Sequence, residues 1–421
     1  MIKTYDTYKD SGIAWIGKIP SDWKVLPIKA ALTRKSEKGH GDAMVLSLYR
    51  DLGIVPKNSR DDNHNVTSEK TDEYRYVEEG DFVINKMKAW QGSMAVSRYC
   101  GIVSPAYYVC SFINEHIFKP YFHYLLRNDS YLPEYRRLSA GMRVGQWDLG
   151  FDDFKSIPFL LPTLHEQQSI ASFLDKKCGE IDELLSVQEQ MINELQAYKQ
   201  SIITEAVTKG LNPNAQMKDC GIEWIGEIPN GWTICRFKNV AKVKANLVHP
   251  DNYLDMQQIA PDCIEKGSGK ILKSRTVKDA NIISDNHLFY KGQIVYSKIR
   301  PTLNKVIIAP YDGLCCADMY PIETTLENKF CLYQMLSSFF YEQVGVVVQD
   351  RVKMPKINKE ELDQITILVP PVNEQKEIAA YLDEKTAQID SLIALKQEKI
   401  TELKDYKKSI IYEYVTGKKK V

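Results

Sequence analysis

Apolar residues recur every seven positions in two long stretches of this sequence. The stretches run from Glu166 to Thr208 and from Glu374 to Thr416, and neither contains an internal proline. A heptad pattern that persists over four to five repeats predicts a coiled coil rather than a helix on the surface of a globular core. The predicted seam residues are Leu174, Ile181, Leu184, Leu195, Tyr198 and Ile202 in the first stretch, and Leu382, Ile389, Leu392, Leu403, Tyr406 and Ile410 in the second.

Helix-breaking residues flank both stretches. Pro162 precedes the first, Pro370 and Pro371 precede the second, and Gly210 ends the first. Two such helices separated by a compact domain most easily pair antiparallel. Polar residues interrupt the middle of the seam, namely Gln188, Lys396 and Lys399. They indicate either a wet, imperfect stretch or a device that fixes the register or docks a partner.

The segments between the helices show the mixed pattern of an α/β (α+β) domain. Short apolar runs predict strands at 44–49, 81–85, 94–97 and 102–109, and again at 293–297, 305–309 and 368–369. Helices are predicted at 121–126 and 330–337. A faint alignment joins the run from Gly80 to Lys86 with the run from Gly292 to Lys298, so the two segments are expected to share one fold.

A second repeat reinforces this division. The block from Gly12 to Trp23 returns about 208 residues later from Gly221 to Trp232, with eight of twelve positions identical. Its tryptophans, Trp15, Trp23, Trp224 and Trp232, could form a stacking platform for bases, but packing against the adjoining domain is favoured. We expect a pseudo-two-fold molecule with globular domains at 1–160 and 213–368 and long helices at 161–212 and 369–421.

Composition limits the classes of protein. The 421 residues carry 55 basic and 55 acidic side chains, so the net charge of zero lacks the excess that nucleic-acid binders usually show. Any DNA contact must therefore rest on local patches or on partner subunits. The nine cysteines have no CxxC spacing, which favours reduced thiols, and no membrane-spanning run or signal peptide is recognised. A cytoplasmic location is expected.

Motifs of catalysis are missing from the sequence. There is no dinucleotide fingerprint and no P-loop, and the only Pro-Pro pair, Pro370-Pro371, lacks the flanking residues of an amino-methyltransferase motif. Asp262 and Glu265 with Lys266 only faintly resemble a nuclease metal site, and the histidines form no metal cluster. We expect a chain that is not an enzyme and binds no metal.

The duplicated features together resemble the specificity subunit of type I restriction-modification systems. They are the GIxWIGxIPxxW block, the PxxxEQ motif at Pro162–Gln167 and at 370–375, the long helix and its YKxSII tail at 198–203 and 406–411. The resemblance implies that each globular domain is a target-recognition domain for one half of a bipartite DNA sequence. It also implies partners: double-stranded DNA, two modification (methyltransferase) subunits docked on the helices, and restriction (motor-nuclease) subunits. S-adenosylmethionine, ATP and Mg²⁺ are then expected on those partners, and no cofactor on this chain.

The helices suit the role of a spacer. About 43 residues at about 1.5 Å rise span about 65 Å, which compares with about 34–36 Å between half-sites in successive major grooves. Because the two domains differ in sequence, the target should be non-palindromic. The alternative is a coiled-coil scaffold that tethers two protein-binding domains without contacting DNA.

Basic and amide side chains on expected loops are the candidate DNA contacts. Arg and Lys can bind guanine or phosphate, and Asn and Gln can bind adenine. Residues that align between the domains (Lys86 with Lys298, Lys88 with Arg300, Arg143 with Arg351) are better candidates for phosphate contacts, because residues that read sequence should differ. The candidates are Lys86, Lys88, Gln91, Arg98, Arg143 and Gln146 in the first domain, and Lys298, Arg300, Asn304, Lys305, Arg351 and Lys353 in the second.

Overall fold

The computed structural model divides the chain into two compact units. Unit 1 comprises Met1–Gln188 with Glu398–Val421, and unit 2 comprises Glu189–Gln397. The structure describes residues 3–59, 71–141, 147–222, 225–351 and 353–421. The division passes through both long helices, so each unit holds one globular domain and a half of each helix. We call the domains domain 1 (residues 1–160) and domain 2 (residues 213–368).

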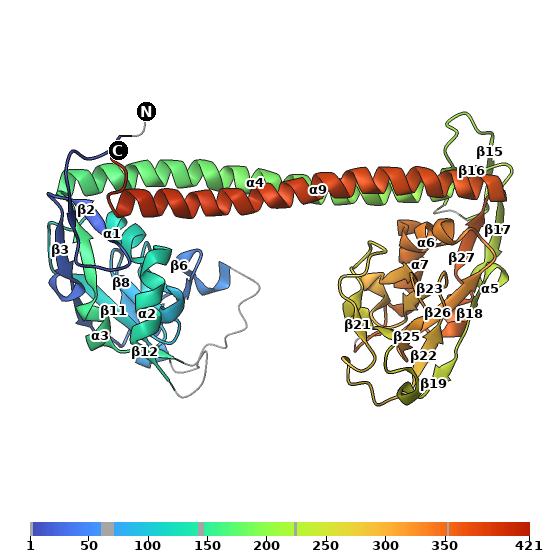
Figure 1. The fold of residues 1–421 in the computed structure, drawn as a ribbon, viewed down its shortest axis with the longest axis horizontal. Helices are drawn as coiled ribbons and strands as arrows, with labels where there is room; N and C mark the ends of the chain where they lie inside the picture. The colour runs from blue at the N-terminus through green and yellow to red at the C-terminus, as the bar shows by residue number, and fades with distance from the viewer. Residues whose placement is uncertain (1–2, 60–70, 142–146, 223–224, 352) are drawn as a thin grey trace. The chain divides into compact units, whose positions relative to one another are not determined.

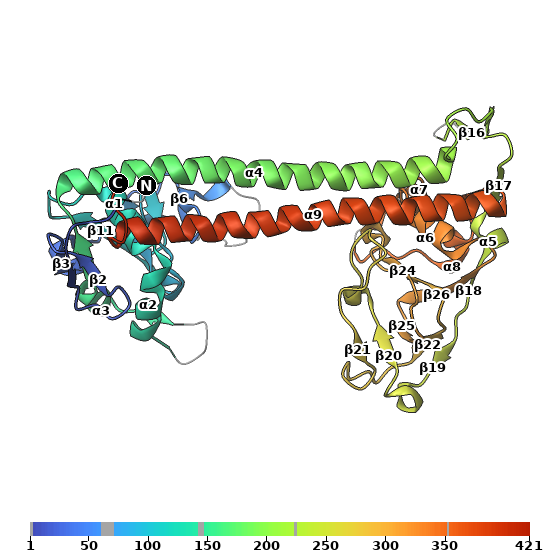
Figure 2. The ribbon, with the colours of Figure 1, turned by 45° about the horizontal axis from the view of Figure 1, so that its top comes forward.

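Each unit contains an antiparallel pair formed by the two long helices, α4 (Leu164–Lys209) and α9 (Val372–Val415). Within each unit they lie side by side in both ribbon views (Figures 1 and 2). In unit 1, Lys407 Nζ lies 2.6 Å from Asp182 Oδ1, and in unit 2, Lys199 Nζ lies 2.7 Å from Asp390 Oδ1. These two ion pairs are the same contact repeated 208 residues later, so the prediction of an antiparallel helix pair built from a repeat is confirmed.

Only one of the two predicted heptad series is buried. Leu174, Ile181, Ile202, Leu382, Ile389 and Ile410 are buried, and Leu195 and Leu403 are partly buried. The other four residues correct the prediction: Leu184, Tyr198, Leu392 and Tyr406 are 49 %, 58 %, 48 % and 57 % exposed. A pair of helices buries a narrower band of side chains than a larger bundle does, so the series that contains Leu184 and Tyr198 stays on the surface.

Unit 1 folds around a four-stranded antiparallel sheet in the order β4-β11-β8-β9. Three helices pack near it: α1 (Lys119–Leu126), α2 (Leu132–Leu138) and α3 (Phe151–Ser156). The strands are β1 Tyr8–Asp10, β2 Lys18–Pro20, β3 Lys24–Pro27, β4 Leu32–Lys35, β5 Leu46–Tyr49, β6 Gly53–Pro56, β7 Arg75–Val77, β8 Phe82–Asn85, β9 Met94–Val96, β10 Gly101–Val103, β11 Tyr107–Phe112, β12 Ser139–Ala140, β13 Asp148–Leu149 and β14 Pro158–Leu161.

Unit 2 repeats this sheet in the order β18-β26-β23-β24 and adds a five-stranded sheet in the order β19-β22-β25-β20-β21. Its helices before α9 are α5 (Phe237–Val240), α6 (Asn328–Leu336), α7 (Ser338–Val348) and α8 (Lys359–Leu362). The strands are β15 Met217–Asp219, β16 Glu227–Pro229, β17 Thr233–Arg236, β18 Ala241–Val243, β19 Leu247–Val248, β20 Gln257–Ile259, β21 Arg275–Thr276, β22 Asn286–Phe289, β23 Ile294–Ser297, β24 Val306–Ile308, β25 Gly313–Cys316, β26 Met319–Thr324 and β27 Thr366–Val369.

The central strands β8 and β23 have continuously apolar sequences because both faces of their sheets are covered. Phe82 and Ile84 join the main core of unit 1, whereas Val83 faces a smaller core on the other side of the sheet. Ile294 and Val295 divide in the same way in unit 2. A sheet covered on both faces needs no alternation of polar residues. The expectation of one shared fold is confirmed, but the run 102–109 forms two strands, β10 and β11, separated by a turn at 104–106.

The repeated motifs join each domain to the helix pair. Trp23 and Trp232 are buried, and their indole Nε1 groups donate to Glu166 and Glu374, each over 3.0 Å. Packing is thus the role of these two tryptophans. Trp15 is half-buried against the ring of Tyr131, and Trp224 lies outside the described residues.

Two different side chains make one equivalent joint between domain and helices. Tyr121 on α1 has a single hydroxyl hydrogen, which it shares between the carbonyls of Val415 (3.1 Å) and Leu160 (3.4 Å). Gln334 on α6 donates from Nε2 to the carbonyls of Val207 and Leu368, both over 3.1 Å. The acceptor carbonyls are repeat partners (Leu160 with Leu368, Val207 with Val415), although the donors are not. The attachment of the domain to the helices is therefore kept while the domain sequences diverge.

Candidate nucleic-acid interface

The central strand of each domain ends at a lysine in the same backbone setting. After β8, the Lys86 carbonyl accepts a hydrogen bond from the backbone N–H of Leu149 over 3.1 Å. After β23, the Lys298 carbonyl accepts one from the N–H of Ile357 over 2.9 Å. The buried strands therefore deliver these aligned lysines to equivalent places on the two domains.

In domain 2 this place holds a cluster of basic side chains. The N–H of Arg300 donates to the Pro355 carbonyl over 2.8 Å, which brings the segment after β23 beside residues 353–357. The Arg351 guanidinium donates to the Lys356 carbonyl and to the Glu361 carboxylate. Lys298, Arg300, Arg351 and Lys356 are therefore brought together. Lys356, which forms an ion pair with Asp318 over 2.9 Å, was not among the predicted contacts.

Arg300 has an unusual backbone conformation. Its φ of 44° lies in the left-handed region, where residues other than glycine are uncommon. The side chain is exposed, and the following Pro301 is buried. Backbone strain of this kind persists only where surrounding contacts impose it, and it concentrates at functional positions. The conformation marks Arg300 as a candidate contact beyond its charge.

A second group of polar residues adjoins the cluster. Arg275 Nε donates to Gln258 over 2.8 Å, and Asp262 carries Lys273 at 2.6 Å and Arg275 at 3.3 Å. Burial raises the pKa of the Cys316 thiol to about 11, and the charges of Asp318, Lys298 and Asp262 also act on it. Strands β20 and β25 run parallel with Ile259 opposite Cys315, so Asp262 and Asp318 follow neighbouring strand ends and the two groups adjoin there. Sequence analysis missed Lys273 and Arg275, although the basic run at 266–278 was a signal for them.

Two predicted contacts of domain 2 have partners inside the protein. Asn304 is only 6 % exposed, and its Nδ2 donates to the Met335 carbonyl over 3.0 Å. This burial corrects the prediction, since a side chain that holds α6 is not presented to a base. Lys305 is half-buried and donates to the Pro261 carbonyl over 2.6 Å. Lys353 is exposed and has no side-chain partner among the described residues.

Domain 1 has a smaller group at the equivalent place. Lys86 pairs with Asp148 over 2.9 Å, Lys88 is exposed and Gln91 is half-buried. Arg98 does not join them, because it lines a cavity beside α1 and the helix pair. Arg143 and Gln146 lie outside the described residues.

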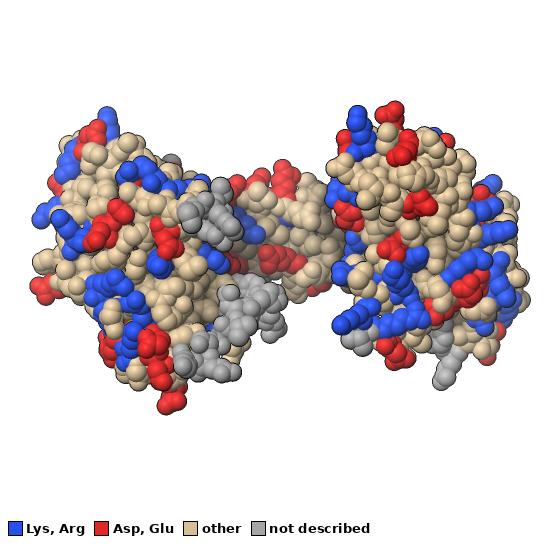
Figure 3. Space-filling model, turned by 90° about the horizontal axis from the view of Figure 1, so that it is seen from below, with Lys and Arg blue, Asp and Glu red and all other residues tan. Residues whose placement is uncertain are grey.

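Acidic residues accompany the basic ones on both domains. Figure 3 looks onto the ends of the domains opposite the helix pair, and it shows Lys and Arg interspersed with Asp and Glu rather than a uniform basic field. Asp148, Asp262, Asp318 and Glu361 each hold a basic side chain of the two groups. Binding of phosphates would exchange these exposed ion pairs for new ones, at a small net cost because each exposed pair contributes little.

Two further features, metal-binding clusters and membrane-spanning helices, concern only the described parts of the chain. No group of three or more His, Cys, Asp or Glu side chains there is arranged to hold a metal ion. None of the helices described there is long and apolar enough to cross a membrane.

Comparison with known proteins places the chain in a family. The family model for the type I restriction modification DNA specificity domain matches twice, at residues 20–197 and 229–405. The chain therefore belongs to this family and carries two such DNA specificity domains.

Individual relatives agree with this assignment. The chain is 33 % identical to the type I restriction enzyme EcoDI specificity subunit of Escherichia coli, over 57 % of each protein. It is 24 % identical to the putative type I restriction enzyme MjaX specificity subunit of Methanocaldococcus jannaschii, over 96 % of each. The chain spans little more than half the length of the first of these relatives.

Two solved structures share the fold. One was described in work on complex assembly and conformational transition of the type I R-M system; it has a TM-score of 0.69 at 15 % identity and covers 94 % of this chain and 98 % of its own. The HsdS subunit from Thermoanaerobacter tengcongensis has a TM-score of 0.50 at 14 % identity, with coverage of 95 % and 98 %. At these identities the likeness concerns the fold alone.

Proposed function

We propose that this chain reads a bipartite, non-palindromic DNA target, with one half-site for each recognition domain. The observation that carries the proposal is a contrast: the two long helices and their joints to the domains are alike in both units, whereas the domain surfaces are not. We call the helices and joints the frame. The joints to the helices are repeated, either with the same residues, as in Trp23–Glu166 and Trp232–Glu374, or with equivalent acceptor carbonyls. The described surfaces around Lys86 and Lys298 differ: Lys86 pairs with Asp148, whereas Lys298 lies beside the pairs Lys356–Asp318 and Arg351–Glu361. Two domains that are held in the same way but present different surfaces are suited to recognising two different half-sites.

The basic groups supply the contacts in this proposal. Lys86 and Lys298, which have the same backbone setting, bind phosphates and position the domains. Lys273 and Arg275 of domain 2 lie at the end of the long connection between β20 and β21, which has only a three-residue counterpart in domain 1, so they are the candidates for base recognition. Arg300 aligns with Lys88 and is a further candidate for a phosphate contact. Arginine is suited to guanine because it can donate two hydrogen bonds to its major-groove edge.

The exposed series on the helices supports a docking role. In unit 1 it comprises Leu184 and Val187 on α4 with Tyr406 on α9. In unit 2 their repeat partners Leu392, Leu395 and Tyr198 are exposed as well. Two equivalent apolar surfaces fit two copies of one partner. We assign them to two modification subunits, and we infer that restriction subunits join the resulting complex.

The chemistry of modification and cleavage is assigned to those partners. On this proposal the chain is not an enzyme and binds no cofactor, whereas the partners carry S-adenosylmethionine, ATP and Mg²⁺. It acts where cellular DNA is accessible, in the cytoplasm. The balanced charge supports a dependence on partners, because acidic side chains pair with basic ones in the candidate DNA-contact groups of both domains.

A mobility-shift experiment tests the DNA role. The full chain is mixed with duplex DNA at several salt concentrations, with and without its modification subunit, and the double variant Lys298→Ala with Arg300→Ala is compared with Lys238→Ala, which lies on α5. Binding that weakens with salt and weakens further in the double variant supports the proposal. Absence of binding with the modification subunit present would instead favour a scaffold that tethers two protein-binding domains.

A further inference from the structure

Unit 1 contains an open cavity between domain 1 and the helix pair. Its volume is about 760 Å³, and it is lined by residues of α1, α4 and α9 and of the loops near Asp51 and Arg98. Asp175 and Asp182 face it from α4. Because they lie seven residues apart on one helix, their positions differ by about 10.5 Å along the helix axis.

Each of these carboxylates has one partner from its own unit. Asp182 accepts from Lys407 Nζ over 2.6 and 2.7 Å, and its side chain is still 55 % exposed. Asp175 accepts from the Tyr124 hydroxyl over 2.7 Å and is exposed. Lys408, which also lines the cavity, lies 3.4 Å from Asp129.

The repeat partners of these carboxylates in unit 2 each hold one more cation. Asp390, the partner of Asp182, binds Lys199 over 2.7 Å and in addition Lys270 over 2.6 Å. Asp383, the partner of Asp175, accepts from the Tyr333 hydroxyl over 2.8 Å and in addition from Lys329. Unit 2 therefore supplies from its own lysines, at each of the two places, one cation that the described residues of unit 1 do not supply: a second cation at Asp390 and a first at Asp383.

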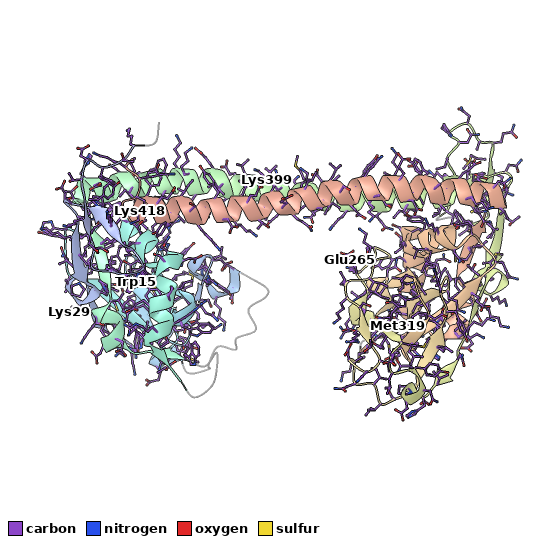
Figure 4. The ribbon with its side chains drawn as sticks, viewed as in Figure 1. Trp15, Lys29, Glu265, Met319, Lys399 and Lys418 are labelled. Atoms are coloured by element: carbon purple, nitrogen blue, oxygen red, sulfur yellow. The ribbon has the colours of Figure 1, made fainter. Side chains whose placement is uncertain are left out.

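Hairpin length explains the difference at Asp390 and Asp182. The difference at Asp383 and Asp175 arises on the helices, because Lys329, four residues before Tyr333 in α6, stands where α1 has Pro120, four residues before Tyr124. Lys270 lies in the connection between β20 and β21, residues 260–274, which packs Gly269 against Leu332 and Leu336 of α6. Figure 4 labels Glu265 on this connection. In domain 1 the connection between β5 and β6 comprises only residues 50–52, and Arg127, directly after α1, donates to the carbonyls of Arg50 and Asp51. The short hairpin leaves the cavity open.

We propose that this cavity binds a basic segment of a partner protein. Two lysine or arginine side chains about two helical turns apart would reach Asp175 and Asp182, as Lys329 and Lys270 reach the repeat partners. The positive groups at the rim do not oppose this binding strongly. Lys407 and Lys408 are paired, and Arg127 is bound to carbonyl oxygens. Arg98 and Lys119 also line the cavity.

A labelled helical peptide with two lysines seven residues apart is the probe. Its binding to the full chain is measured by fluorescence anisotropy at low salt. Asp175→Asn should weaken binding by about fivefold, the upper range for an exposed ion pair, since asparagine can still accept from Tyr124. The matched variant Asp383→Asn should leave the affinity unchanged, because that position is already filled by the chain itself.

A second variant adds charge without removing an acid. Gly179 lies on α4 in the cavity lining, between the two carboxylates in sequence, and a Cβ there meets no atom within 4 Å. Gly179→Lys should place an internal ammonium group in the cavity and abolish peptide binding. Its repeat partner variant, Ala387→Lys, should not. Both substitutions favour the helix or leave it intact.

Several results would overturn the inference. They are no peptide binding to the wild-type chain, equal losses in Asp175→Asn and Asp383→Asn, or displacement of the peptide by spermidine at equal concentration, which would identify a polyamine site. The DNA role is independent of this site. Asp175→Asn should therefore bind duplex DNA like the wild type, so failure of one proposal is distinguishable from failure of the other.

Discussion

Replacing the buried glutamine of a PxxxEQ motif should weaken the packing of that domain against its long helix and lower the free energy of unfolding. Gln167 is fully buried and makes three hydrogen bonds: Nε2 donates to the carbonyls of Pro162 (3.0 Å) and His116 (2.9 Å), and Oε1 accepts from the N–H of Phe118 (2.8 Å). Gln375 makes two of the corresponding bonds, to the Pro370 carbonyl (2.9 Å) and from the N–H of Glu327 (2.8 Å).

The magnitude follows from the groups left without partners. A buried polar group without a hydrogen bond costs about 1–3 kcal/mol. Gln167→Ala leaves three such groups, two of them carbonyls that can recruit water, so we expect a loss of about 3–5 kcal/mol. Gln375→Ala leaves two and should cost about 2–4 kcal/mol. The control Gln190→Ala removes only an exposed bond to Glu194 on the next turn and should cost at most about 0.5 kcal/mol.

Hydrogen exchange with thermal unfolding provides the assay. Gln167→Ala should speed exchange at the Phe118 amide and lower the temperature at which unit 1 unfolds, while the Glu327 amide in unit 2 stays protected. Gln375→Ala should do the reverse. Losses in both glutamine variants no larger than in the control would show that the repeated motif does not hold the domains to the helices, and would refute the reasoning.

Three further results are expected. Burial raises the pKa of the Asp390 carboxyl, but hydrogen bonds from Lys199 and Lys270 outweigh this effect, and the pKa lies below its ordinary value. The ionised carboxylate therefore stabilises the fold above the unfolded pKa of about 3.9, and this stabilisation is lost as pH falls below it. In unfolding curves, the stability difference between wild type and Asp390→Asn should shrink as pH falls through that range. Asn304→Ala should destabilise unit 2 by about 1–3 kcal/mol in a denaturant titration and leave the DNA target unchanged; a changed target would restore Asn304 as a base contact. Arg351→Ala should weaken binding to all duplexes alike and lower the salt slope by about one, as measured by anisotropy on specific and random DNA, whereas a loss confined to one sequence would make Arg351 a base reader.

The frame could be predicted from sequence because its signals are local and repeated. The heptad series, the flanking prolines and the duplicated blocks give the helix pair and the two domains directly. The heptad rule alone cannot say which of two adjacent series is buried, since that depends on how many helices meet. Leu184 and Tyr198 were therefore placed wrongly.

The interface depends on contacts between distant segments, which a single sequence does not reveal. Lys356 reaches the cluster through a bridge to Ile299, and Lys270 reaches α9 across more than a hundred residues. Asn304 was expected on a loop as an amide able to contact a base, but it has a left-handed backbone conformation and its amide donates to the Met335 carbonyl of α6. Polarity and loop position alone do not separate a side chain that binds a ligand from one that holds the fold.

Methylation-site sequencing of host DNA tests the central claim most directly. Cells carry the modification subunit together with either the wild-type chain or a chain in which residues 213–368 are replaced by the second recognition domain of another specificity subunit. We expect one bipartite, non-palindromic motif for the wild type, and a motif altered in one half only for the exchanged chain. An unchanged motif, or one altered in both halves, would contradict the assignment of one half-site to each domain.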